Sequence, residues 1–252
     1  MLAAESGRAP VGHISFLLYS DAGSHNMQTH CTHLLSSHLQ GQANSVGWAL
    51  VRSGYNEQDD ILALMRTIGA ELGRVVVGRH SASTEFLRPR TRVEASPRSQ
   101  SAAFGLNEIP LHSDQSHKPV PCRYLVLGCL DADGATSTNM LKWRKLNLSE
   151  DEWRLLEQAP ILVDNGRLSF FSTILPANRS YMRYDRACLR ARCNRGKTAL
   201  TLLEHRLSEE CPTSHFWRRG DILLIDNWNT LHGRAASTQS NRCLARMMFD
   251  GR

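Results

Sequence analysis

An imidazole and a carboxylate stand two residues apart in the segment Leu111-His112-Ser113-Asp114. Successive side chains of a β-strand point to opposite faces, so residues i and i+2 share one face. His112 and Asp114 could therefore point toward one common position. By itself the pair favours a surface turn, because His-x-Asp occurs often by chance.

A second histidine, His232, follows an apolar run at residues 222–225 and a polar turn at residues 226–229. Two histidines and one carboxylate can occupy one face of an octahedral metal site and leave three positions open. This ligand set is typical of Fe(II) sites that react with O₂. We therefore predict that His112, Asp114 and His232 are metal ligands and catalytic residues.

Two arginines, Arg242 and Arg246, follow His232 in the segment Arg-Cys-Leu-Ala-Arg. A strand that returns beside His232 would place a guanidinium group near the metal. Arginine suits such a place, because its planar fork matches a carboxylate bidentately and its charge persists on burial. This segment predicts a binding site for a carboxylate next to the metal.

The elements that would position these residues are mostly strands. Apolar or alternating runs at residues 45–52, 122–130, 221–226 and 243–249 predict strands. Helical spacing at residues 61–72 and 197–207, and a capping box formed by Ser149 and Glu152, predict helices. Because strands and helices do not alternate regularly, we expect a mainly β fold with flanking helices rather than a Rossmann or TIM architecture.

Length and charge exclude several classes of protein. A chain of 252 residues suits one domain with a small appendage. The net charge of +6 comes from scattered arginines without a basic block, so no nucleic-acid partner is expected. No apolar run approaches the roughly 20 residues of a membrane helix. Seven cysteines without a Cys-x-x-Cys pair, and no secretory pattern at the start, favour a cytoplasmic protein.

The composition changes near residue 44. Residues 1–44 are rich in Ser, Gly, Gln and His, and we expect a polar, mobile appendage there. Within it, His25, His30, Cys31, His33 and His38 lie close together in sequence, but their spacing matches no familiar metal site, so a polar N-terminus is the favoured interpretation. Residues 45–252 form the predicted main domain.

Residues 45–250 resemble the TauD/TfdA-type Fe(II)- and 2-oxoglutarate-dependent dioxygenases, a group that includes the clavaminate-synthase-like enzymes. The resemblance rests on four segments in the right order: LHSDQSHKPVPCRYLVLGC, DGATSTN, GDILLIDNWNTLHGRAA and RCLAR. It implies a double-stranded β-helix, the cupin-like jelly roll. It also implies Fe(II) and 2-oxoglutarate as cofactors, with O₂ as cosubstrate.

The family's binding residues match individual positions here. The three predicted metal ligands match the Fe(II) ligands of the family. Thr136 matches a threonine that hydrogen-bonds a 2-oxoglutarate carboxylate, Arg242 matches the arginine that pairs with the far carboxylate, and Arg246 matches a second arginine that serves cosubstrate or substrate. The family's Gly-Gly-Asp-Thr stretch is Asp-Gly-Ala-Thr here, so Ser137 or Thr138 could replace Thr136.

Substrate contacts in this fold lie on variable loops. Asn107 and Glu108 precede the His112 strand and are candidates for contact with substrate. His117 could line the mouth of the site, although a solvated loop histidine is favoured. Arg183 is either an inward-facing residue or a surface residue. We expect these contacts within residues 84–110, 137–150 and 170–185.

The resemblance implies hydroxylation of an unactivated C–H bond of a small molecule, such as an amino acid or a natural-product intermediate, with release of succinate and CO₂. Asp114 argues against a halogenase, whereas desaturation, epoxidation and ring formation stay open. The alternatives are the same chemistry on a peptide or protein side chain, a metal-binding jelly-roll protein without oxygenase activity, and a zinc hydrolase with the same ligands. A homo-oligomer is compatible with the sequence.

Overall fold

The computed structural model describes residues 14–15, 25–78, 81–164, 166, 168–237 and 241–251, with side chains from residue 34 onward. The helices are α1 (His25–Val46), α2 (Gln58–Ala70), α3 (Gln100–Phe104), α4 (Glu150–Gln158) and α5 (Asn194–Ser208). The strands are β1 (Ile14–Ser15), β2 (Trp48–Arg52), β3 (Glu85–Leu87), β4 (Ile109–His112), β5 (Tyr124–Asp131), β6 (Ser137–Lys142), β7 (Ile161–Val163), β8 (Phe170–Ser172), β9 (Leu189–Ala191), β10 (Thr213–Phe216), β11 (Asp221–Asp226), β12 (Thr230–Arg234) and β13 (Cys243–Phe249).

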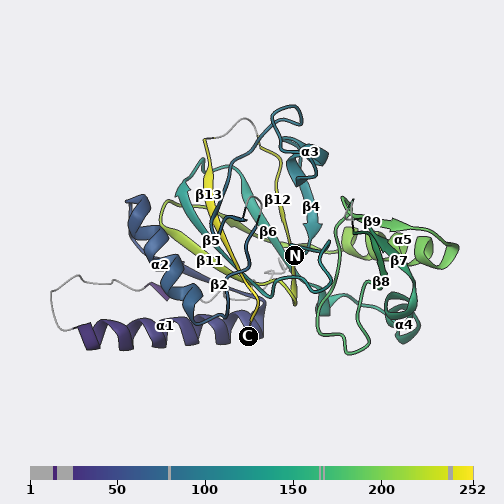
Figure 1. Ribbon diagram of the computed structural model, residues 1–252, viewed down its shortest axis with the longest axis horizontal. Coiled ribbons are helices and arrows are strands. Elements are labelled where there is room, and N and C mark those ends of the chain that lie inside the picture. The colour runs from purple at the N-terminus through teal and green to yellow at the C-terminus, as the bar shows by residue number, and fades with distance from the viewer. Residues whose placement is uncertain are drawn as a thin grey trace, which may run out of the picture.

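Two sheets form the centre of the molecule (Figure 1). The larger sheet has the order β1-β2-β11-β5-β13-β3, and the smaller one has the order β10-β6-β12-β4. Apart from the parallel pair β1 and β2, neighbouring strands are antiparallel. These facing sheets have the architecture of a jelly roll, so the predicted mainly β fold with flanking helices is confirmed.

Alternation along the strands separates two hydrophobic cores. On β11, Leu223 and Ile225 point between the sheets, where they pack with Met140 of β6. Ile222 and Leu224 point to the opposite face, toward the helices. Successive side chains of a strand point to opposite faces, and both faces of β11 are buried, so every residue of this run is apolar. This alternation also determines which residues of the later strands can reach the space between the sheets.

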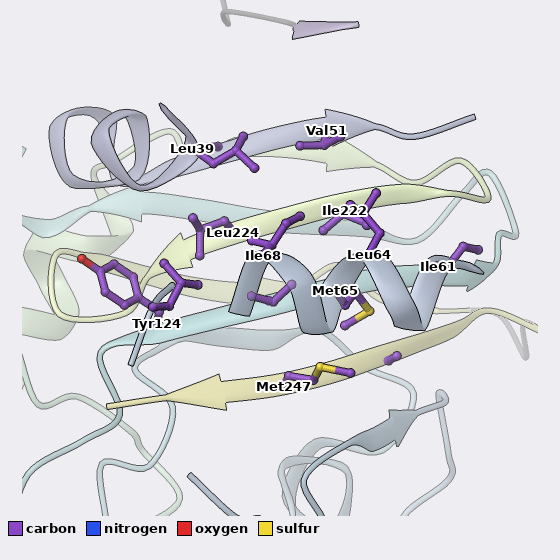
Figure 2. Close-up of a cluster of buried hydrophobic side chains, with 14 of the residues drawn as sticks. Leu39, Val51, Ile61, Leu64, Met65, Ile68, Tyr124, Ile222, Leu224 and Met247 are labelled. Atoms are coloured by element: carbon purple, nitrogen blue, oxygen red, sulfur yellow. The ribbon is translucent and has the colours of Figure 1, made fainter. Parts of the chain in front are cut away.

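Helices α1 and α2 cover the outer face of the larger sheet. Figure 2 shows α2 lying across this face, with Ile61, Met65 and Ile68 directed onto the strands. These residues follow the helical spacing of the sequence, so the predicted helix is confirmed. At the other side of the molecule, β7, β8, β9, α4 and α5 form an insertion after β6 (Figure 1).

Helix α1 lies on both sides of the boundary predicted at residue 44. Helix α1 runs through residue 44, and Leu35, Leu39 and Ala43 are buried in the core under the larger sheet. These apolar residues recur every four positions, which gives a narrow stripe within an otherwise polar helix. The side chains of His25, His30, Cys31 and His33 and the other residues before 34 lie outside the described part.

Replacing Leu39 with alanine tests whether α1 belongs to the main domain. Leu39 is fully buried, and we expect Leu39→Ala to lower the free energy of unfolding by about 2–5 kcal/mol. Leu34 lies on the same helix and is 60% exposed, so Leu34→Ala is the control and should change stability by less than about 0.5 kcal/mol. Urea denaturation measures both. Equal, small effects would show that α1 is dispensable to the domain.

Some other predictions changed in detail. The capping box of Ser149 and Glu152 at the start of α4 is confirmed. Residues 137–142, expected within a substrate loop, instead form the central strand β6. The cysteines described with side chains carry free thiols. Of the helices in the described ranges, none has the length and apolar character needed to cross a bilayer.

Candidate active site

Strands β4 and β12 bring the two predicted histidine ligands together. His112 and His232 are direct partners across the antiparallel pair, and their ring centroids are 4.6 Å apart. Facing residues of neighbouring strands share one side of the sheet. Both imidazoles are more than nine-tenths buried. Residues separated by 120 positions in the sequence are therefore adjacent at the site.

Asp114 completes the cluster from the loop after β4. Its Oδ1 atom lies 3.6 Å from Nε2 of His112 and 3.9 Å from Nε2 of His232. One potential ligand atom from each residue lies within 4.8 Å of the others, and all three residues are buried. Three donors of this kind on one side of a small space fit a divalent metal ion.

The hydrogen bond of His112 and the neutral form of His232 suit metal binding. Nδ1 of His112 donates a hydrogen bond to the carbonyl of Pro110 over 2.9 Å, so its Nε2 is free to present a lone pair. Burial, and then the charge of His112, lowers the pKa of His232 to about 3. Burial also acts to lower the pKa of His112, but Asp114 outweighs it and the pKa is raised. His232 is therefore neutral at physiological pH.

Asn227 holds the backbone of Asp114 in place. Its side-chain oxygen accepts a 2.8 Å hydrogen bond from the Asp114 amide, and its Nδ2 donates to the carbonyls of Asp114 and Cys122 over 3.1 and 2.8 Å. Our sequence analysis missed this residue. Its place directly after the buried strand β11 was the available signal, because a buried amide there must find partners.

Replacing Asn227 with alanine should be among the more destabilising changes outside the apolar core. Asn227→Ala would leave three buried backbone groups without a partner, and we expect the free energy of unfolding to fall by about 2–4 kcal/mol. The control is Asn178→Ala, which removes an exposed asparagine and should cost less than about 0.5 kcal/mol. Denaturant unfolding measures the free energy of unfolding of both variants, and equal, small losses would contradict this role of Asn227.

Arg246 on β13 binds one of the two carboxylate oxygens of Asp114. Its NH1 donates to Oδ2 of Asp114 over 2.7 Å, while Nε and NH2 donate to Oε2 of Glu85. Burial acts to raise the pKa of Asp114, but Arg246 and the two imidazoles hold it well below its usual range. Asp114 is therefore ionised, with Oδ1 facing the histidines and Oδ2 held by Arg246.

Arg242 lies beside Thr136 and is a buried cation without an acid partner among the described residues. It is 5% exposed, its NH1 makes one long hydrogen bond of 3.5 Å to the Thr136 carbonyl, and its Nε has no partner in the described part of the chain. Burial, and then the charge of Arg234, lowers the pKa of Arg242 to about 10, so it stays protonated. Unpaired donors of this kind fit an anionic group of a ligand.

The hydroxyl of Thr136 has a partner of its own. It donates to Oδ2 of Asp133 over 2.7 Å and lies 3.2 Å from the hydroxyl of Ser237. Arg234, which the sequence analysis did not select, is buried and donates to the carbonyls of Gly105 and Asn107. It thereby fixes the backbone that leads into β4 and adds positive charge near Arg242.

The remaining substrate candidates lie in different surroundings. Asn107 and Glu108 are exposed and His117 is half-buried. Glu108 lines a cavity of about 290 Å³ next to Leu111 and Tyr184, and the described residues that line it include none of the predicted metal ligands. Contact of Glu108 with substrate stays a prediction.

Arg183 lies inside the protein, so of the two positions that the sequence left open, the inward-facing one is observed and the surface one is wrong. It is 1% exposed, and its NH1 donates to the carbonyls of Ser116 and Lys118 while NH2 donates to that of Pro119. These bonds occupy both terminal nitrogens. Arg183 therefore holds the loop that follows Asp114.

Comparison with known proteins gives a match to one family model over part of the chain. Residues 152–248 match the family model described as the taurine catabolism dioxygenase TauD, TfdA family. The resemblance to the TauD/TfdA family is confirmed. The matched segment contains His232, Arg242 and Arg246, and it ends before the last residue of β13. No curated protein matches the chain.

Solved structures share this TauD-like fold at low sequence identity. An asparagine oxygenase bound to Fe(II), hydroxyasparagine and succinate is 18% identical, with a TM-score of 0.71, over 90% of this chain and 83% of its own. The non-haem iron oxygenase OrfP bound to Fe and α-ketoglutaric acid is 17% identical, with a TM-score of 0.72, over 87% and 80%. PvcB from Pseudomonas aeruginosa is 19% identical, with a TM-score of 0.62, over 87% and 81%.

These findings agree with the predicted enzyme class, an iron- and 2-oxoglutarate-dependent dioxygenase. OrfP was solved with the two cofactors that the sequence predicts, Fe and 2-oxoglutarate, the latter named α-ketoglutaric acid, and the asparagine oxygenase was solved with Fe(II) and succinate. At identities below 20% they establish the fold. The site of this chain must therefore be argued from its own residues.

Proposed function

We propose that this chain is a non-haem Fe(II)- and 2-oxoglutarate-dependent oxygenase that hydroxylates an unactivated C–H bond of a small molecule. The observation that supports this most strongly is the buried cluster of His112, Asp114 and His232 together with the guanidinium of Arg242, which has no acid partner among the described residues. A metal hydrolase needs the three ligands, but it has no use for Arg242. An oxygenase of this class needs both.

The three ligands would hold Fe(II), with His112 and His232 as neutral imidazoles and Asp114 as the anionic ligand. When bound, Fe(II) and 2-oxoglutarate supply the O₂ activation that such hydroxylations need, with succinate and CO₂ as products. The residues of the chain position the ligands and exclude water from the site. Burial excludes water from the ligands, Pro110 orients the His112 ring, and Asn227 fixes the backbone of Asp114.

The far carboxylate of 2-oxoglutarate fits the donors of Arg242. A guanidinium fork can pair with a carboxylate through two parallel hydrogen bonds. Such a partner would reduce the free-energy cost of burying this cation, for which the described residues supply one long hydrogen bond. Thr136 lies at the same place, and a reorientation of its hydroxyl away from Asp133 would allow a further bond to that carboxylate.

The substrate that we propose is an amino acid or a natural-product intermediate. The asparagine oxygenase was solved with 3-hydroxyasparagine, and OrfP was solved with 3-hydroxyarginine. Both are hydroxylated amino acids on the same fold, which makes free amino acids the first class of compounds to test. The cytoplasmic location and a homo-oligomeric state stay predictions.

An anaerobic titration tests the cofactor part of this proposal. Metal-free protein receives Fe(II) and 2-oxoglutarate, and we expect the visible charge-transfer band of their chelate. His112→Ala should lose the band, while His205→Ala, which removes an exposed histidine of α5, should keep it. A panel of amino acids then shows which one accelerates succinate formation. If saturating Fe(II) and 2-oxoglutarate give no band, a zinc hydrolase or a binding protein becomes the better interpretation.

A further inference from the structure

A line of three charged side chains connects the edge of the larger sheet with the predicted metal site. Glu85 of β3 accepts hydrogen bonds from Nε and NH2 of Arg246 over 3.1 and 2.5 Å. NH1 of Arg246 then donates to Oδ2 of Asp114 over 2.7 Å. We infer that Glu85 is a positioning residue for the iron site and acts on Asp114 through Arg246. This inference rests on the proposed function.

The backbone register makes the first of these contacts specific. Strand β3 is the edge strand of the larger sheet, and Glu85 lies directly opposite Arg246 on β13. Arg246 lies on the inward face of β13 together with Leu244 and Met248. The side chains of Glu85 and Arg246 are 13% and 22% exposed, so solvent screens their interaction only in part. The short strand β3 therefore places one carboxylate against one buried guanidinium.

Glu85 determines which nitrogens of Arg246 remain available to Asp114. A guanidinium has two edges that can each pair with a carboxylate, and Glu85 occupies the edge formed by Nε and NH2. Only NH1 then reaches Asp114, and it takes Oδ2. Oδ1 is left toward Nε2 of His112 and Nε2 of His232. The arrangement presents a single oxygen of Asp114 to the metal ion.

Without Glu85, Arg246 would become a competitor of the metal. Its freed edge could turn toward Asp114 and pair with both carboxylate oxygens, because the bidentate geometry is the favoured one. The positive charge of Arg246 would also lose one of its two neighbouring anions, which raises the electrostatic cost of a divalent ion nearby. Both effects weaken metal binding without removing a metal ligand.

A double-mutant cycle on metal affinity tests this inference. Co(II) replaces Fe(II) as a spectroscopic probe, and the metal-free protein is titrated as wild type, Glu85→Gln, Arg246→Met and the double variant. We expect Glu85→Gln to raise the dissociation constant for Co(II) about 10-fold, within the range found for partners behind a metal ligand. In the Arg246→Met background the same substitution should have no effect, because the competing guanidinium is gone.

The controls separate this role from a general loss of a salt bridge. Glu204→Gln breaks a glutamate–arginine pair with Arg186 on the insertion and should leave Co(II) affinity unchanged. Glu85→Asp keeps the charge and should recover most of the affinity that Glu85→Gln loses. If Glu85→Gln lowers the melting temperature of metal-free protein, the comparison of Glu85→Gln with Glu85→Asp, made well below both melting temperatures, measures the contribution of the charge.

Two results would overturn the inference, and they differ from failure of the proposed function. Wild-type Co(II) affinity in Glu85→Gln would show that Glu85 does not position Asp114. An equal loss with and without Arg246 would show that Glu85 acts directly on the ion. In contrast, wild-type protein that binds neither Co(II) nor Fe(II) would contradict the proposed function itself.

Discussion

Asp114→Asn should reduce Fe(II) affinity at least about 10²-fold and should remove 2-oxoglutarate turnover. This loss exceeds the usual effect of removing a residue that hydrogen-bonds a metal ligand, because Asp114 is itself a predicted ligand. Asp114 is the one anionic ligand in a cluster whose other two donors are neutral imidazoles. Asparagine has the same shape but no charge, so it can still accept from Arg246 while binding the ion far more weakly. Metal titration and succinate formation measure the two effects.

The fold of this variant should survive, because the Asp114 backbone keeps its bonds to Asn227. Arg246 also keeps Glu85 as an ionised partner. The matched control is Asp131→Asn, which removes a half-exposed carboxylate paired with Arg219 and should leave Fe(II) affinity unchanged. An Asp114→Asn protein with wild-type iron affinity would show that the ion is held elsewhere.

The parts of the site that could be predicted are those with a local pattern. His112 and Asp114 share a strand face because they are two residues apart, and His232 follows an apolar strand that is recognisable in sequence. Strands β5, β11 and β13 were visible for the same reason, because their buried faces need continuous apolar residues. Local periodicity is enough to identify such elements.

The parts that could not be predicted depend on contacts between distant residues. Glu85 and Arg246 are 161 positions apart, and only the pairing of β3 with β13 makes them neighbours. Asn227 and Arg183 are polar residues whose roles follow from the backbone groups that they meet. The sequence does not show which partner a polar side chain will meet. For apolar side chains, periodic spacing along the chain predicts which ones are buried.

Arg242→Ala should raise the apparent KM for 2-oxoglutarate about 10²- to 10³-fold, with Fe(II) affinity close to that of wild type. Truncating one partner of a buried charge pair costs about 2–5 kcal/mol, and each 1.4 kcal/mol corresponds to a factor of ten. Arg242 stays charged, since its pKa is lowered only to about 10. The KM of Arg242→Lys for 2-oxoglutarate should fall between those of wild type and Arg242→Ala, because lysine keeps the charge but lacks the two-pronged guanidinium.

The same variant has an unusual expected effect on stability. Arg242 has no acid partner among the described residues and one long hydrogen bond, so its burial opposes folding while 2-oxoglutarate is absent. We therefore expect the ligand-free Arg242→Ala protein to unfold at the same or a higher denaturant concentration than wild type. Saturating 2-oxoglutarate should stabilise wild type by mass action but not the variant.

Arg219→Ala is the control for both measurements, since it removes an exposed arginine paired with Asp131. It should change the KM for 2-oxoglutarate less than about twofold, because screened surface pairs contribute little. If Arg242→Ala instead retained the wild-type KM, or if the ligand-free variant lost stability as a paired residue would, the unpaired guanidinium would not be the cosubstrate site. An unchanged KM with intact iron binding would then point to Arg234, a buried cation near Arg242, as the partner of 2-oxoglutarate.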